Sequence, residues 1–123
     1  MAGLETKQFD TPDETRPFAD KGEAQVVAIG DQIVLKGRFD PGWRWSEHLK
    51  PVVGTDSCQS PHFLYVLSGR MGVVMNDGSE GEVGPNSVAR IEPGHDAWVI
   101  GDEACIVVDF GASAAYAKPA GES

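Results

Sequence analysis

The 123-residue sequence has no long hydrophobic run and little positive charge. Its 10 lysines and arginines are outnumbered by 19 aspartates and glutamates, which gives a formal net charge of -9. Because an acidic surface repels phosphate backbones and anionic lipids, neither nucleic acid nor a membrane is expected as a partner. No apolar segment approaches the roughly 20 residues that a membrane-spanning helix needs. The polar first residues also lack the apolar centre of a secretory signal, so the expected compartment is the cytoplasm.

Cysteine is also scarce, since the chain has only Cys58 and Cys105. A structural disulfide between them is not expected in a cytoplasmic protein. Cys105 belongs to the apolar segment ACIVVDF, which predicts a small core residue. Cys58 lies in a polar loop, where a purely structural cysteine is unusual. Cys58 is therefore a candidate functional residue.

Helical periodicity is missing as well, because no stretch keeps an apolar helical pattern over three turns. Instead, 15 glycines and 8 prolines separate short apolar runs, a pattern typical of many strands joined by turns. This spacing indicates an all-β sandwich or barrel. The predicted strands are 24–29, 32–39, 43–49, 62–68, 71–76, 87–92, 97–101 and 104–110.

The length favours a single domain. We expect the β-barrel domain at residues 23–111. It follows an N-terminal arm, residues 1–22, which is rich in Asp, Glu, Thr and Pro. The small, polar residues 112–123 predict a flexible C-terminal tail. In an alternative interpretation, the N-terminal arm packs across a neighbouring subunit.

Residues 24–111 resemble the cupin superfamily. The resemblance is carried by YVLSG at 65–69, an acidic turn at 76–82, GPNS at 84–87 and EPG at 92–94. It implies a single-domain jelly-roll β-barrel of the cupin type. In that family, three histidines and a glutamate from two motifs hold one divalent metal inside the barrel. Because cupins commonly pair through their sheets, the resemblance also implies a homodimer.

Aligned on these motifs, the chain lacks the usual metal ligands. Counting back from Gly69, His62 stands at the glutamate position, Cys58 at the second histidine position and Asp56 at the first. In the second motif, Ala97 replaces the histidine. The resemblance therefore implies that the fold is kept while the metal site is altered.

Other histidines fall where they could replace the missing ligands. If His62 occupies the glutamate position, strand alternation points it into the barrel together with Leu64 and Val66. His95 has the inward parity of position 97 and lies about 7 Å nearer the barrel mouth. His48 lies on the predicted strand 43–49. The candidate metal ligands are His48, Cys58, His62 and His95.

Cysteine and histidine suit transition metals better than magnesium or calcium. We expect one divalent ion, zinc or iron first, with nickel or copper as alternatives. Three or four ligands with one open position are typical of a catalytic site. Arg44, Leu64 and Val66 are candidate substrate-binding residues, and Arg44 could hold a carboxylate. Asp56 is either a second-sphere partner or a loop residue.

The favoured function is a small metal-dependent cupin enzyme acting on a small organic molecule inside the barrel. Its chemistry would be oxygenation, isomerisation, cyclisation or a lyase step, and the sequence identifies no catalytic residue. Each histidine alone has a structural interpretation, as a hydrogen-bonded or turn residue. One alternative is therefore a non-enzymatic binding or sensing module without metal. Another is a thiol or redox role for Cys58, which predicts a lowered thiol pKa.

Overall fold

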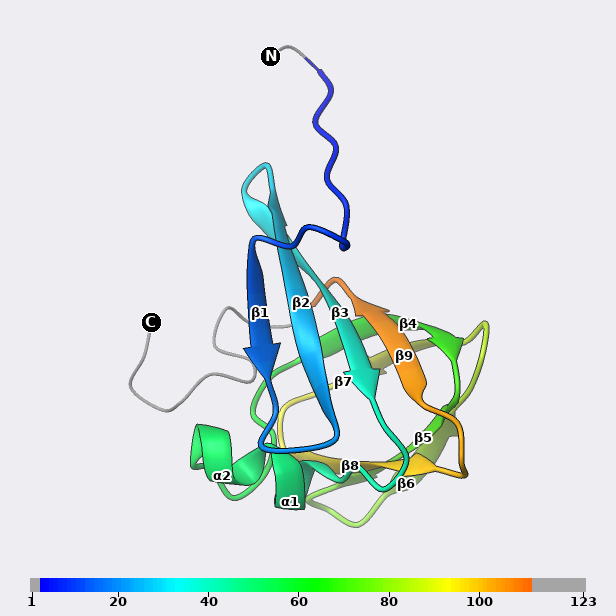
Figure 1. Ribbon diagram of the computed structural model, residues 1–123. Coiled ribbons are helices and arrows are strands. Elements are labelled where there is room, and N and C mark those ends of the chain that lie inside the picture. Colours follow the sequence, from blue (N-terminus) through cyan, green and yellow to red (C-terminus); the bar gives the residue numbers. More distant parts are fainter. Residues whose placement is uncertain (1–2, 112–123) are drawn as a thin grey trace.

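The computed structural model describes residues 3–111, which fold into two antiparallel β-sheets (Figure 1). The larger sheet has the strand order β1-β2-β3-β9-β4-β7, and the smaller has the order β6-β5-β8. Two four-residue helices, α1 and α2, connect β3 to β4. The bounds are β1 Glu14–Pro17, β2 Gly22–Ile29, β3 Gln32–Phe39, α1 Trp45–His48, α2 Lys50–Val53, β4 His62–Ser68, β5 Arg70–Met75, β6 Glu80–Val83, β7 Val88–Ile91, β8 His95–Ile100 and β9 Cys105–Asp109.

The two sheets share one apolar core. Along β4 the inward positions are buried and the alternate positions are more exposed, as a two-residue repeat requires. Inward side chains from β3, β9 and β4 join those of β5 and β8 in a single hydrophobic cluster. The predicted all-β class is confirmed. Cys105 is fully buried, as predicted for a core residue, and both cysteines are free.

The prediction of a strand at 43–49 is wrong, because α1 occupies most of this segment. Trp45 and Leu49 are both buried and stand four residues apart, which is the spacing of one helical face. The Leu49 amide donates to the Trp45 carbonyl at 2.9 Å. Only Arg44 keeps a strand-like contact, an isolated bridge to Trp98 of β8.

Two strands were not predicted. β1 lies inside the expected N-terminal arm and pairs with β2 of the same chain, from Glu14 opposite Val26 to Pro17 opposite Glu23. β6 lies largely in the segment interpreted as an acidic turn, and it forms a ladder with β5 although three of its four residues are glycine or glutamate. The expected C-terminal tail, 112–123, lies outside the described residues. No helix within residues 3–111 is long and apolar enough to cross a lipid bilayer.

Candidate metal centre

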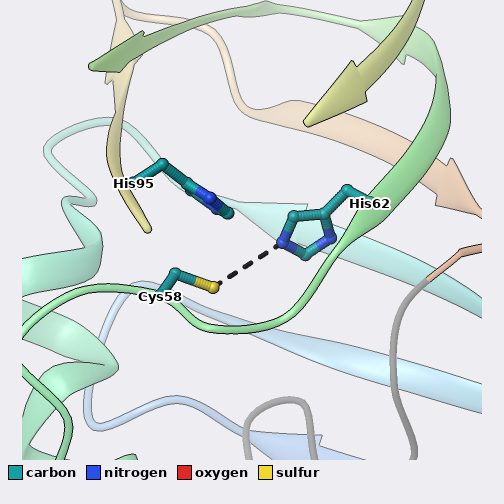
Figure 2. A group of neighbouring side chains, drawn as sticks. All are labelled: Cys58, His62 and His95. Atoms are coloured by element: carbon teal, nitrogen blue, oxygen red, sulfur yellow. Dashed lines mark hydrogen bonds between the residues drawn. The ribbon is translucent and has the colours of Figure 1, made fainter. Parts of the chain in front are cut away.

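Two side chains at or just before the start of β4 and one from β8 meet inside the barrel (Figure 2). Cys58 lies in the loop between α2 and β4, His62 is the first residue of β4, and His95 is the first residue of β8. One sulfur or nitrogen atom from each lies within 4.8 Å of the other two. All three side chains are buried. We refer to Cys58, His62 and His95 as the cysteine–histidine group.

Backbone hydrogen bonds fix the loop that carries Cys58 against β8. The Cys58 amide donates to the His95 carbonyl at 2.8 Å, and the Gly94 amide donates to the Cys58 carbonyl at 2.7 Å. Gly94 has a φ of +95°, a left-handed conformation that favours glycine in this turn. Two members of the group are therefore held together by main-chain geometry, independently of any ion.

His62 is oriented by Asp109, the last residue of β9. The Nδ1 atom of His62 lies 2.5 Å from Asp109 Oδ2 and donates to it. The other carboxylate oxygen of Asp109 accepts from the amides of Phe63 and Gly111. With its Nδ1 proton engaged, His62 turns Nε2 toward Cys58, whose Sγ lies 3.7 Å away.

His95 is oriented in the same way by a main-chain carbonyl. Its Nδ1 lies 2.8 Å from the Glu92 carbonyl oxygen, so this nitrogen donates and Nε2 is the nitrogen that can bind a metal. Its ring meets that of His62 edge-on, with 5.2 Å between the ring centroids. Metal-binding histidines usually donate their second N–H to a carboxylate or a carbonyl. Both histidines have this arrangement.

The group carries separated charges. Burial alone would raise the pKa of the Cys58 thiol, but hydrogen bonds from His62 and His95 outweigh it and lower the pKa to about 6. Burial would likewise lower the pKa of His62, but Asp109 and Cys58 raise it to about 9. For Asp109, burial is outweighed mainly by His62, which holds the carboxyl pKa below its usual range. Near neutral pH, the metal-free protein therefore has a Cys58 thiolate and a His62 imidazolium next to the Asp109 carboxylate.

The donor set fits a transition metal. In a tetrahedral site with bonds of about 2.3 Å to sulfur and 2.0 Å to nitrogen, these two donors stand roughly 3.5 Å apart. The distance of 3.7 Å between Cys58 Sγ and His62 Nε2 is close to that value. The thiolate and imidazole donors suit zinc, iron, copper or nickel. The cysteine–histidine group can therefore bind such an ion.

A small cavity of about 30 Å³ adjoins the group. It has room for one or two water molecules. Asp109 also lines it, together with Phe39, Trp43 and Trp45 and several aliphatic side chains. Among the described residues, Trp43 alone has a buried side-chain N–H without a hydrogen-bond partner. Because buried N–H groups in proteins nearly always have a partner, a water or ligand atom is expected to accept from it.

Of the four candidate ligands, the structure brings Cys58, His62 and His95 together but not His48. His48 lies on α1, where its Nδ1 accepts from the Arg44 amide at the start of the helix at 3.0 Å. The alternation argument for His48 assumed a strand, and the helix removes that assumption. Asp56 is an exposed loop residue.

The candidate substrate-binding residues are also separated. Leu64 lines the small cavity, whereas Val66 is buried in the core and does not line it. Arg44 stacks on the Trp98 ring, 4.9 Å from its centroid, and lies 3.5 Å from Asp96. Arg44 is not among the residues that line the cavity.

Sequence reasoning missed Asp109. The signal was present in ACIVVDF, where an acid has the inward parity of Cys105 and Val107 within an apolar strand. An ionised residue at a core position requires a partner, and that partner is His62.

Comparison with known proteins supports the fold. No protein-family model matches the chain, and no curated protein matches it. The polyketide cyclase RemF from Streptomyces resistomycificus is similar in structure, with a TM-score of 0.61, 19% identity and coverage of 89% of this chain and 80% of RemF. An uncharacterised double-stranded β-helix protein from Klebsiella pneumoniae has a TM-score of 0.57 at 19% identity and covers 89% of this chain and 92% of its own.

A mutant of the oxalate decarboxylase OxdC from Bacillus subtilis is also similar, with a TM-score of 0.60 and 16% identity. The match covers 91% of this chain but only 31% of the decarboxylase. At these identities the likeness establishes the architecture. The chain has the double-stranded β-helix, or cupin, fold, and the predicted cupin-type barrel is confirmed.

Proposed function

We propose that this protein is a small metal-binding cupin enzyme, in which Cys58, His62 and His95 hold one divalent transition metal. The observation that carries the proposal is the convergence of three buried donor atoms within 4.8 Å of one another. Zinc and iron suit these donors, with nickel and copper as alternatives. The substrate would be a small organic molecule that undergoes oxygenation, isomerisation, cyclisation or a lyase step. The cyclase and the decarboxylase among the similar structures support this range of chemistry.

Groups of the protein itself orient the two histidine side chains for metal binding. Asp109 and the Glu92 carbonyl hold the Nδ1 protons of the two histidines, so each presents Nε2. The apolar lining keeps bulk water out and lowers the local dielectric, which strengthens interactions with charge. A bound ion would supply Lewis acidity or, if iron, dioxygen chemistry. Trp43 also lines the cavity, and its buried indole N–H has no acceptor among the described residues, which leaves it free to donate to a bound oxygen atom.

Metal analysis of four purified, untagged proteins tests the proposal. The wild type and His48→Ala should each hold about one equivalent of metal, since His48 lies outside the group. Cys58→Ala and His95→Ala should both lose metal, together with any activity found. If the wild type takes up no ion after incubation with zinc, iron, nickel and copper in turn, the metal proposal fails. The non-enzymatic, metal-free binding module would then be preferred.

A second candidate function is thiol chemistry at Cys58 in the metal-free protein. Cys58, His62 and Asp109 form a chain of contacts of 3.7 and 2.5 Å, the order in which a nucleophile, a base and an orienting carboxylate are found in thiol enzymes. Alkylation separates the two functions. Fast reaction of Cys58 that a bound ion does not slow supports thiol chemistry and argues against metal ligation by this sulfur.

We also propose a cytoplasmic homodimer that pairs through the outer face of the larger sheet. Support for the compartment comes from two buried cysteines that remain free. Support for the dimer comes from exposed apolar side chains on and beside β4, which a monomer would leave in water. They are Phe63, Leu67, Val88 and Phe110.

A further inference from the structure

A groove lies between β6 and β7, the two strands that end the smaller and the larger sheet. Within residues 3–111 no ladder joins these two edges, although they follow each other in the chain. The groove has a volume of about 360 Å³. That lies within the range of about 300–1,000 Å³ that is typical of small-molecule pockets. The groove therefore has the room for an organic molecule that the 30 Å³ cavity lacks.

The walls of the groove are apolar and come from the inward faces of three strands. At Gly81, an added Cβ would meet no atom within 4 Å, so the wall of β6 is open there. Gly81 stands opposite Val73 in the β5–β6 ladder and thus faces the same side. The six wall residues are Val73, Met75, Gly81, Val83, Ala89 and Ile91.

The rim of the groove is acidic. It carries three carboxylates, of Glu80, Glu82 and Glu92, and one guanidinium, of Arg90. Arg90 pairs with Glu92, and Glu82 lies 3.3 Å from Arg70. Among the described residues, Glu80 has no salt bridge, and it is an exposed residue that lines the groove. A positive charge on a ligand would complement this rim, whereas a negative charge would be repelled.

The groove adjoins the cysteine–histidine group through two side chains. Ile91 stands directly opposite His62 in the β4–β7 ladder and lines both the groove and the small cavity. Met75 stands opposite His95 in the β5–β8 ladder and lines the groove. The cross-strand neighbours of both histidines are therefore wall residues of the groove.

We infer that this groove binds a small molecule with an apolar body and one positive charge, and that Ile91 separates the bound molecule from the cysteine–histidine group. The body packs against the six wall residues, and the charged group lies at Glu80. Binding in the groove requires no metal. Only the role of the groove as the substrate site rests on the proposed function.

Titration of the isotope-labelled, metal-free protein with benzylamine tests the binding. Backbone and methyl resonances of Val83, Ala89 and Ile91 should shift, and those of Leu35, which lines only the small cavity, should not. Benzyl alcohol and benzoate have the same ring without the positive charge. Benzoate should bind about tenfold more weakly than benzylamine. Equal binding of the two, or shifts spread over other surfaces, would overturn the inference.

Two variants make the test specific. Gly81→Leu fills the open wall without a strained backbone, because Gly81 is not among the positive-φ glycines. It should abolish the benzylamine shifts while the protein stays folded. Glu80→Gln should weaken benzylamine and leave benzyl alcohol unchanged. Retained benzylamine binding in Gly81→Leu would show that the ligand lies elsewhere.

The separating role of Ile91 is tested by the rate at which N-phenylmaleimide alkylates Cys58 in the metal-free protein. Ile91→Ala should raise this rate several-fold, because it joins the groove to the cavity. Leu64→Ala is the matched control, since Leu64 lines the cavity but not the groove. Ile91→Val and Leu64→Val serve if the alanine variants do not fold. Equal alkylation rates in the Ile91 variant and its Leu64 counterpart would overturn the separating role of Ile91. This outcome does not depend on whether the wild type binds a metal.

Discussion

Asp109 is the residue that decides which nitrogen His62 presents to the site. It accepts the Nδ1 proton at 2.5 Å and is itself held by two main-chain amides. Because its oxygens are engaged there, Asp109 acts on a metal through His62. Partners of this kind typically change metal affinity by about 10–100-fold when they are replaced.

We therefore expect Asp109→Asn to lower metal affinity by about 10–100-fold. Asn can still accept from the Phe63 and Gly111 amides, but its amide group would donate to Nδ1 and move the histidine proton to Nε2. Competition with a chromophoric chelator measures the change. Asp40→Asn is the control, since Asp40 pairs with Arg38 outside the site. Unchanged affinity in Asp109→Asn would show that His62 is not a ligand.

The pH dependence of Cys58 follows from its lowered pKa. In the metal-free protein its alkylation rate should rise with a midpoint near pH 6 rather than near the ordinary 9.0. The stability that the thiolate contributes is complete above the unfolded pKa of 9.0 and is lost as the pH falls through about 6. Thermal unfolding of the wild type and Cys58→Ser should therefore converge at acidic pH.

Cys105 provides the control for that measurement. Burial raises its pKa to about 11, so Cys105 should not react near neutral pH. Cys105→Ala should leave the alkylation curve unchanged. A midpoint near pH 9 in both proteins would contradict the charge separation between Cys58 and His62.

The first motif located Cys58 and His62 by their offsets from a turn glycine, and strand alternation located His95 by its inward parity. His48 could not be judged in this way, since no motif covers it and its position depended on a strand. Asp109 was missed because it supports a ligand instead of standing at a ligand position. Sequence spacing thus identifies donors more readily than the groups that orient them.

At the scale of elements, alternation of apolar residues was a sound guide to long strands and a poor guide to short segments. The segments 32–39 and 62–68 were predicted with the bounds that the structure has. The segment 43–49 was misread because Trp43 and Trp45 fit a two-residue period, while Trp45 and Leu49 fit a helical one. In so few residues both periods are present, and tertiary packing decides.

The turn between β4 and β5 depends on Gly69. Gly69 has a φ of +75°, and an added Cβ would meet the Ala104 carbonyl oxygen and lie 2.5 Å from Cys105 Cα. Gly69→Ala should thus cost about 3 kcal/mol or more of unfolding free energy. Gly101 has a similar φ of +86° but open space around it. Gly101→Ala should cost only ~1–2 kcal/mol.

Urea denaturation of the two variants and the wild type measures this difference. Because both substitutions carry the same conformational penalty, the excess at Gly69 reports the steric contact with the segment before β9. Equal losses would show that this segment moves aside.

For the whole molecule, the proposed dimer makes a prediction about surface residues. Phe63 is 53% exposed on the outer face of β4. Phe63→Glu should convert a dimer into a monomer, since it places a charge in an apolar interface. Light scattering coupled to size-exclusion chromatography measures the mass. Ser79→Glu, in the exposed turn before β6 of the smaller sheet, should stay dimeric, and a monomeric wild type would contradict the proposal.

The positions of the three donors also have a mechanical consequence. His62 belongs to the larger sheet and His95 to the smaller, so an ion held by both would cross-link the two layers of the barrel. Ligation would then add its binding free energy to the resistance of the layers to separation. Removal of the ion by a chelator would weaken the contact between the two sheets, while the hydrogen bonds within each sheet stayed intact. The metal concentration would thereby determine the lifetime of the folded state, in addition to any role of the metal in catalysis.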